Sequence, residues 1–190
     1  YTDVDAARAR SSLWDSVANS QFRVAVGVSN DVARVNNGFI VTDGSGAWTS
    51  ATINPPTQNR FNSVAWNGVA FVAITQGAST QIYTSVDGQI WDESFNTGET
   101  LRSKVVVKDG IFYIAGTLKI LTSSNGIDWA IMAANITANL LSWDGTLFWS
   151  GTTHVSPDAI HWNQASTPTY GTVLRSPTRM ISFSPLGLYR

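Results

Sequence analysis

The sequence predicts an all-β protein, built as a small β-propeller of four-stranded blades that number about five or form part of a larger propeller. Three observations predict this fold. A tight-turn motif recurs along the chain, a second hairpin signature precedes its copies, and the repeat length is roughly 35–48 residues. Four short strands in each period of this length are typical of propeller blades.

The turn motif has its clearest form in residues 83–91, which read Tyr-Thr-Ser-Val-Asp-Gly-Gln-Ile-Trp. An Asp-Gly pair between alternating apolar residues predicts a hairpin, because glycine tolerates positive φ and aspartate can accept hydrogen bonds from nearby backbone N–H groups. We expect the serine to hold the incoming strand, and the tryptophan to pack between neighbouring sheets. The residues expected in these structural roles in the four copies are Asp43 and Trp48; Ser85, Asp87, Gly88 and Trp91; Asn125, Gly126 and Trp129; and Ser156, Asp158 and Trp162.

The second signature is an apolar strand, a tight turn and a strand with an aromatic residue. It occurs in residues 63–73, 105–115 and 140–149, with Asn-Gly or Asp-Gly at each turn. Degenerate copies flank these three. The blades of a propeller domain over residues 13–190 are therefore predicted to begin near residues 13, 61, 103, 138 and 179, after an N-terminal arm of residues 1–12.

Four complete blades and a half-blade leave two ways to complete the ring. In one, the N-terminal arm pairs with the half-blade and closes a five-bladed ring, since closure removes exposed strand edges. In the other, further sequence or another subunit completes a larger propeller.

The repeated turns resemble the Asp-box, Ser-x-Asp-Gly-x-x-Trp, of the sialidase-like (BNR-type) β-propellers. The resemblance implies the propeller fold, and it implies that the aspartates stabilise turns rather than catalyse a reaction. Sialidases also hold a sugar carboxylate with three arginines. This chain is much shorter than a six-bladed sialidase and contains no recognisable Tyr–Glu nucleophile pair, so we expect that it is not an enzyme.

The composition argues against several partners. The formal net charge is −1, and only 13% of the residues are charged. Nucleic acids and anionic membranes both require a basic excess, so neither is an expected partner. No apolar run approaches the roughly 18–20 residues of a membrane span. The chain has no cysteine, and its two histidines lack the spacing of a zinc site, so we expect no metal and no cofactor.

Propeller geometry separates two sets of loops. If the strands of a blade are named A to D, the repeated A–B and C–D turns lie on one face, and the more variable B–C and D–A loops lie on the other. Variable loops on a rigid scaffold commonly carry binding residues. The candidates are Asn30, Arg34, Gln76, Lys119 and His154 from the B–C loops, and Arg60, Arg102 and Arg175 from the D–A loops.

The recurrent arginines have two interpretations. They cap strand ends and pair with acidic residues of a neighbouring blade, or they converge and bind a carboxylate or sulfate through bidentate hydrogen bonds.

The function predicted from these observations is a non-catalytic recognition or structural module. We expect it to be displayed outside a cell or on a virus or phage particle, to bind a glycan or a protein partner, and to form a homo-oligomer or join a larger particle. One alternative is a fragment of a sialidase-like glycoside hydrolase. The other is an assembly or scaffold factor similar to the Asp-box propeller that helps to build photosystem II.

Overall fold

The computed structural model describes residues 12–29, 37–44, 46–101, 103–135, 140–151 and 153–165, and the backbone of three further strands between residues 172 and 189. Every regular element in these ranges is a β-strand. A search of the same residues finds no helix that is long and apolar enough to cross a membrane. The fold is therefore all-β, as predicted.

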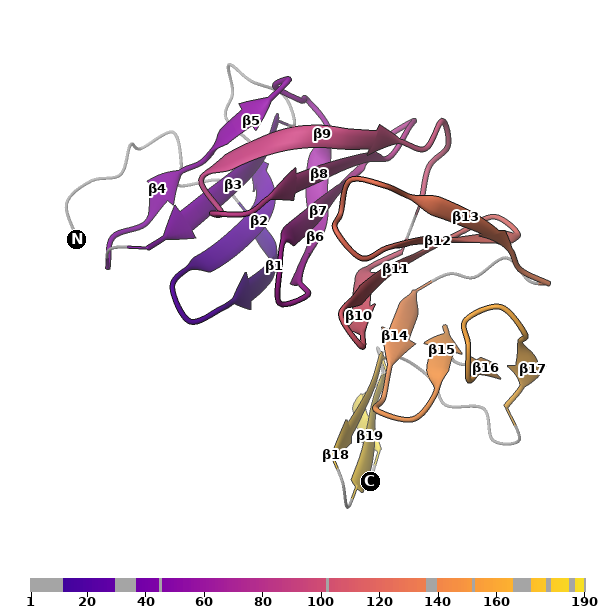
Figure 1. The fold of residues 1–190 in the computed structure, drawn as a ribbon. Coiled ribbons are helices and arrows are strands. Elements are labelled where there is room, and N and C mark those ends of the chain that lie inside the picture. The colour runs from indigo at the N-terminus through magenta and orange to yellow at the C-terminus, as the bar shows by residue number, and fades with distance from the viewer. Residues whose placement is uncertain are drawn as a thin grey trace.

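Four antiparallel four-stranded blades follow one another along the chain (Figure 1). In each blade the strands pair in sequence order, because short turns join neighbouring strands. Blade 1 contains β1 (Ser12–Ala18), β2 (Arg23–Ser29), β3 (Asn37–Asp43) and β4 (Thr49–Ser50). Blade 2 contains β6 (Arg60–Trp66), β7 (Phe71–Gln76), β8 (Gln81–Ser85) and β9 (Ile90–Asn96).

Blades 3 and 4 have shorter strands. Blade 3 contains β10 (Val105–Lys108), β11 (Ile111–Gly116), β12 (Lys119–Ser123) and β13 (Ala130–Ala133). Blade 4 contains β14 (Leu141–Trp143), β15 (Phe148–Ser150), β16 (His154–Ser156) and β17 (Asn163–Gln164). One short strand, β5 (Thr52–Asn54), leaves blade 1 and adds to blade 2 by pairing in parallel with β9.

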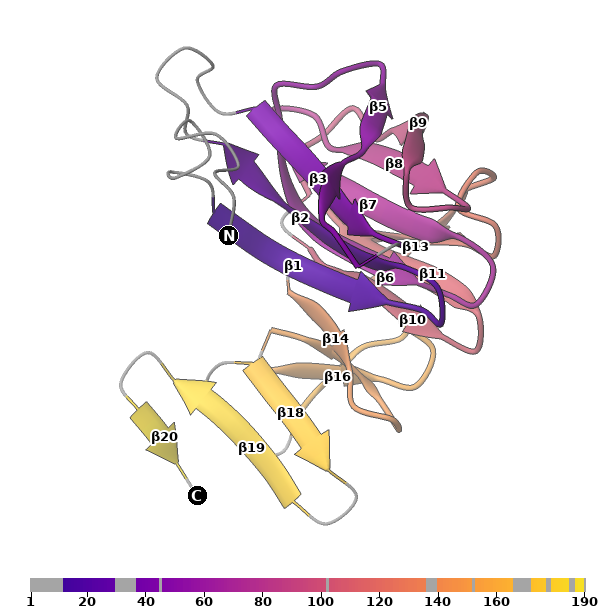
Figure 2. The same cartoon turned by 90° about the vertical axis from the view of Figure 1, so that its left-hand side faces the viewer.

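A further sheet of three strands follows blade 4. It consists of β18 (Thr172–Ser176), β19 (Arg179–Ser184) and β20 (Gly187–Tyr189), and in Figure 2 it lies beside blade 4 and away from β1. The structure thus has four four-stranded blades, and the expectation of about five blades or of part of a larger propeller is not confirmed. The predicted arm lies outside the described residues, apart from Ser12, which already begins β1.

Apolar side chains between consecutive blades form the core. Three hydrophobic clusters join blade 1 to blade 2, blade 2 to blade 3 and blade 3 to blade 4. The first contains Val24, Val26 and Ile40 of blade 1 together with Phe71 and Trp91 of blade 2. Burial of each large apolar side chain contributes about 1.5–3 kcal/mol, so these seams hold the blades together. Within the described ranges, no such cluster joins blade 4 to blade 1.

The innermost strands define two faces of the molecule. β1, β6, β10 and β14 contact their successive neighbours, as the first strands of propeller blades do around the central axis. We call the end with the A–B and C–D turns the turn face, and the opposite end, with the B–C and D–A loops, the loop face.

Candidate functional site

A pocket of about 510 Å³ lies on the loop face, where the innermost strands begin. Residues from all four blades contribute to it, because the first strand of each blade starts near the axis. The pocket is lined by Trp14, Asn62, Gln76, Ser103, Lys104 and Leu140.

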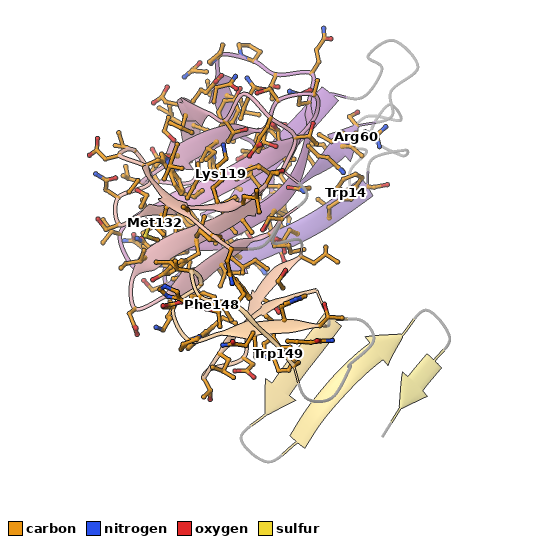
Figure 3. All side chains as sticks on the ribbon, turned by 90° about the vertical axis from the view of Figure 1, so that its right-hand side faces the viewer. Trp14, Arg60, Lys119, Met132, Phe148 and Trp149 are labelled. Carbon is orange, nitrogen blue, oxygen red and sulfur yellow. The ribbon has the colours of Figure 1, made fainter. Side chains whose placement is uncertain are left out.

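Trp14 supplies an aromatic surface at the edge of this pocket. It stands at a β-bulge in β1 between Leu13 and Asp15, and such a bulge changes the direction in which a side chain points. The Arg60 guanidinium lies over the indole, 5.9 Å from the ring centroid, and Figure 3 shows the two side chains together. The indole is 37% exposed, so part of it remains accessible to a ligand.

Asn62 occupies the corresponding bulge in β6, between Phe61 and Ser63. Its amide nitrogen donates a long hydrogen bond of 3.5 Å to the Ser103 carbonyl. Its Oδ1 atom is buried, and it accepts no hydrogen bond from the described part of the protein. A buried acceptor without a donor costs about 1–3 kcal/mol, so a ligand hydroxyl or N–H group that reached this atom would gain a strong partner.

A polar network beside the pocket joins three blades. Asp15 Oδ2 accepts hydrogen bonds from the Ser63 hydroxyl at 2.8 Å and the Val64 N–H group at 3.2 Å. The same oxygen lies 3.3 Å from Lys104 Nζ, and Ser63 Oγ accepts a hydrogen bond from the Val105 N–H group at 3.1 Å. Asp15 thus offsets the charge of the half-exposed Lys104.

The other binding residues expected from the sequence are scattered. Gln76 lines the pocket and Arg60 borders it, whereas Lys119 forms an ion pair with Glu99 at 3.1 Å and lies apart from Trp14 (Figure 3). His154 Nδ1 is 2.9 Å from the Thr153 hydroxyl, in blade 4. Arg102, Asn30, Arg34 and the side chain of Arg175 lie outside the described residues. Sequence reasoning missed Trp14, Asn62 and Lys104, because only strand register and bulges bring them together.

The C–D turns of blades 2 to 4 lie on the turn face and share one hydrogen-bond scheme. In blade 2, Asp87 Oδ1 accepts from the Gln89 and Ile90 N–H groups at 2.8 and 3.0 Å, and from the Ser85 hydroxyl at 3.0 Å. Gly88, with φ of 70°, lets the chain reverse here. In each of the three blades the indole N–H group of the tryptophan donates a hydrogen bond to the backbone carbonyl three residues earlier, at 2.9–3.0 Å. The pairs are Trp91–Gly88, Trp129–Gly126 and Trp162–Ala159.

These turns change the acidity of their aspartates. Burial by itself raises the pKa of Asp87, but the hydrogen bonds from Ile90, Gln89 and Ser85 outweigh it, and the pKa lies below its usual value. For Asp158, burial is again outweighed, here by the His161 side chain, two N–H groups and the Ser156 hydroxyl, so the pKa is well below its usual range. Both carboxylates are therefore ionised at neutral pH and engaged in holding turns.

Blade 1 departs from this scheme. Asp43 Oδ1 still accepts a hydrogen bond from a turn N–H group, that of Gly46 at 2.6 Å, but the expectation that Trp48 packs between neighbouring sheets was wrong. The paired residues Thr42 and Thr49 enclose residues 43–48, one residue fewer than the stretch 85–91 between Thr84 and Asp92 in blade 2. Within the described residues no blade packs against this side of blade 1, and Trp48 is 46% exposed, whereas Trp91 is fully buried. Asp43 pairs across the sheet with Arg23, at the position where Ser85 pairs with Phe71.

Comparison with solved structures shows the same fold in proteins of very different sequence. The designed protein Ika4 is 8% identical with a TM-score of 0.50, over 81% of this chain and 90% of that one. PorZ of Porphyromonas gingivalis is 10% identical with a TM-score of 0.52, and YCF48 of Cyanidioschyzon merolae is 16% identical with a TM-score of 0.50. Both alignments cover 90% of this chain, which spans only 24% of PorZ and 59% of YCF48.

No curated protein sequence matches the chain. The sequence profile of the DUF6242 beta propeller domain, in contrast, matches residues 42–142, which are more than half of the chain. Those residues include the end of β3 and all of β4 in blade 1, all of blades 2 and 3, and the start of blade 4. The chain therefore belongs to the DUF6242 β-propeller domain family.

Proposed function

We propose that this domain is a non-catalytic recognition module that binds a glycan in the pocket on the loop face. One observation carries the proposal. The pocket places the accessible Trp14 indole beside Asn62, whose buried Oδ1 atom has no donor in the described protein.

A sugar combines the chemistry that these groups require. The C–H groups of a pyranose ring pack against an indole, and its hydroxyls both donate and accept hydrogen bonds. A hydroxyl would donate to Asn62 Oδ1, while the amide of Gln76 and the ammonium of Lys104 would supply donors. The volume of about 510 Å³ lies within the range of roughly 300–1,000 Å³ found for ligand pockets.

Binding without catalysis fits the residues around the pocket. Glycoside hydrolysis generally requires two carboxylates on either side of the scissile bond. None of the six described lining residues is acidic, and the neighbouring Asp15 carboxylate is already bonded to Ser63, Val64 and Lys104. These observations favour a binding module over the sialidase-like alternative.

The C–D turns of blades 2 to 4 fit the Asp-box interpretation, in which the motif stabilises the scaffold and leaves the loop face for recognition. We place such a module outside the cell or on a particle surface, where glycans are accessible, and we expect it to be part of a larger assembly.

A glycan array followed by titration tests the proposal. Trp14→Ala should weaken binding of a neutral glycan at least about tenfold, because it removes the stacking surface. Trp48→Ala is the matched control, since Trp48 is also exposed but lies on the turn face, and it should leave this affinity unchanged. Unfolding curves of each variant show whether the scaffold is intact. Equal binding by Trp14→Ala and wild type, or no glycan bound by the folded protein, would contradict the proposal.

A further inference from the structure

The turn face of blade 1 carries a second pocket, of about 250 Å³. It lies between the A–B turn and the C–D turn of this blade, at the opposite end of the molecule from the first pocket. It is lined by Asn19, Ser20, Gln21, Phe22, Arg23, Asp43, Gly44 and Gly46. We call this place the blade 1 corner.

The other three blades have a different pair of residues at the corresponding position. There the first part of the second strand places a fully buried phenylalanine opposite a buried serine; the pairs are Phe71–Ser85, Phe112–Ser123 and Phe148–Ser156. Blade 1 has Arg23 opposite Asp43 at this position. Blade 1 therefore differs from the other three blades at both positions, with an ion pair in place of the phenylalanine and the serine.

The Asp43 carboxylate is almost completely engaged. Its side chain is 2% exposed, its Oδ1 atom accepts from the Gly46 N–H group at 2.6 Å, and its Oδ2 atom accepts from Arg23 Nη2. A buried carboxylate without a partner costs several kcal/mol, so the arginine compensates this charge. In return, the bond to Asp43 orients the guanidinium.

Arg23 presents the rest of its guanidinium to solvent. Its side chain is 62% exposed, and the group lies 5.6 Å from the centroid of the Trp48 ring. A guanidinium has five N–H donors, and the bond to Asp43 uses one of them. An oriented, accessible guanidinium beside a half-exposed indole is suited to a ligand that has both a carboxylate and an apolar ring face.

The walls of the pocket are held in place by local bonds. Asn19 Oδ1 accepts from the Gln21 and Phe22 N–H groups at 2.8 and 2.7 Å, which fixes the A–B turn. A Cβ atom at Gly44 would lie 2.5 Å from the Phe22 ring, so glycine is required for this close approach. The corner is thus shaped before a ligand binds, which lowers the entropic cost of binding.

We propose that the blade 1 corner binds a carboxylate-bearing sugar, a uronic acid residue. The carboxylate would pair with the solvent-exposed edge of the Arg23 guanidinium, and the sugar ring would lie beside Trp48. The sugar hydroxyls would form hydrogen bonds with Ser20 and Gln21 at the edge of the pocket. The volume admits about one sugar ring. Because Asp43 offsets most of the arginine charge, we expect a dissociation constant of about 1 mM for a single uronate. The affinity should fall as the salt concentration rises.

Fluorine NMR of the full chain labelled with 5-fluorotryptophan tests this site directly. The Trp48 resonance is assigned with Trp48→Phe, and the labelled protein is titrated with galacturonate and, in parallel, with galactose. Galacturonate should shift the Trp48 resonance without shifting that of Trp14, and galactose should bind at least about tenfold more weakly, since it lacks the charge-assisted hydrogen bonds. No shift of Trp48 with galacturonate, or equal affinities for the two sugars, would overturn the proposal.

A paired substitution separates binding from folding. Arg23→Phe combined with Asp43→Ser installs the Phe–Ser pair of blades 2 to 4, and it should abolish the galacturonate shift while leaving the protein folded. Arg23→Lys keeps the charge but loses the planar fork, and it should weaken binding by about tenfold. A folded double variant with wild-type affinity would contradict the proposal. Trp14→Ala should leave the galacturonate titration unchanged, so the proposals for the two pockets can be contradicted independently of each other.

Discussion

The tryptophan that follows the C–D turn has different surroundings in blade 1 and in blade 2. In blade 2 the tryptophan after the C–D turn is fully buried against Phe71 and against blade 1, and its indole N–H group donates a hydrogen bond to the Gly88 carbonyl. In blade 1 the corresponding tryptophan is 46% exposed and lies beneath an arginine. Contact with a preceding blade, and not the motif alone, therefore decides whether the indole joins the core.

The largest expected effect separates the two tryptophans. Trp91→Ala should lower the free energy of unfolding by about 3–5 kcal/mol, because it leaves a cavity in the seam between blades 1 and 2. Trp48→Ala should lower it by less than about 1 kcal/mol, as for other surface positions. Urea denaturation followed by circular dichroism measures both values. Similar losses for the two variants would show that Trp48 also supports the fold.

The next effect concerns the ion pair of blade 1. Arg23→Ala should lower the free energy of unfolding by about 1–3 kcal/mol, because it leaves the buried Asp43 carboxylate without its charged partner. Arg23→Phe combined with Asp43→Ser should recover most of this loss, since it restores the pair used by the other blades. A double-mutant cycle in urea measures the coupling. Strictly additive effects would mean that the two positions do not act as a unit.

A smaller difference is expected within the C–D turns. Asp87→Ala should cost about 1–3 kcal/mol, because the Gln89 and Ile90 N–H groups lose their acceptor. Asp87→Asn should cost less than about 1 kcal/mol, since Asn125 Oδ1 accepts the equivalent bonds in blade 3 at 2.9 Å. Thermal unfolding compares the variants, with glycan binding at the loop face as a control that should not change. An asparagine variant as unstable as the alanine variant would show that the charge itself is required.

The smallest effect is on the pH dependence. The pKa values of Asp87 and Asp158 are lowered in the folded state, so their stabilisation is complete above the unfolded value of about 3.9 and is lost as the pH falls through the folded values. Replacing both by asparagine should flatten the fall in stability between about pH 5 and pH 2. Denaturation at a series of pH values measures this slope. An unchanged slope would place the acid sensitivity in other carboxylates.

Much of the fold could be predicted because its signals are local. The hydrogen bonds of the C–D turns join residues no more than three positions apart. Ser85, Asp87 and Gly88 therefore predict the hairpin from one short stretch of sequence. The A–B turns follow the same logic, since the Asp144 side chain accepts from the N–H groups of Thr146 and Leu147. Repetition of these signals at a regular distance then predicted the four-stranded blade.

The proposed binding sites could not be predicted in the same way. Trp14, Asn62 and Lys104 are far apart in the sequence, and bulges in β1 and β6 bring the first two to the edge of one pocket. Of the recurrent arginines, Arg60 lies against Trp14, a contact that no spacing along the chain reveals. A binding pocket is a property of several strands at once, whereas the sequence pattern describes each strand separately.

The sequence by itself determined the all-β class, the hairpins and the identity of the turn residues, because short-range backbone geometry and hydrogen bonding depend on neighbouring residues. Only the tertiary structure decided which side chains became core and which became surface. Trp48 and Trp91 each follow a C–D turn, yet one indole is half-exposed and the other is buried. The difference arises because burial requires a second surface, and in the described part of the chain Trp91, but not Trp48, packs against a preceding blade.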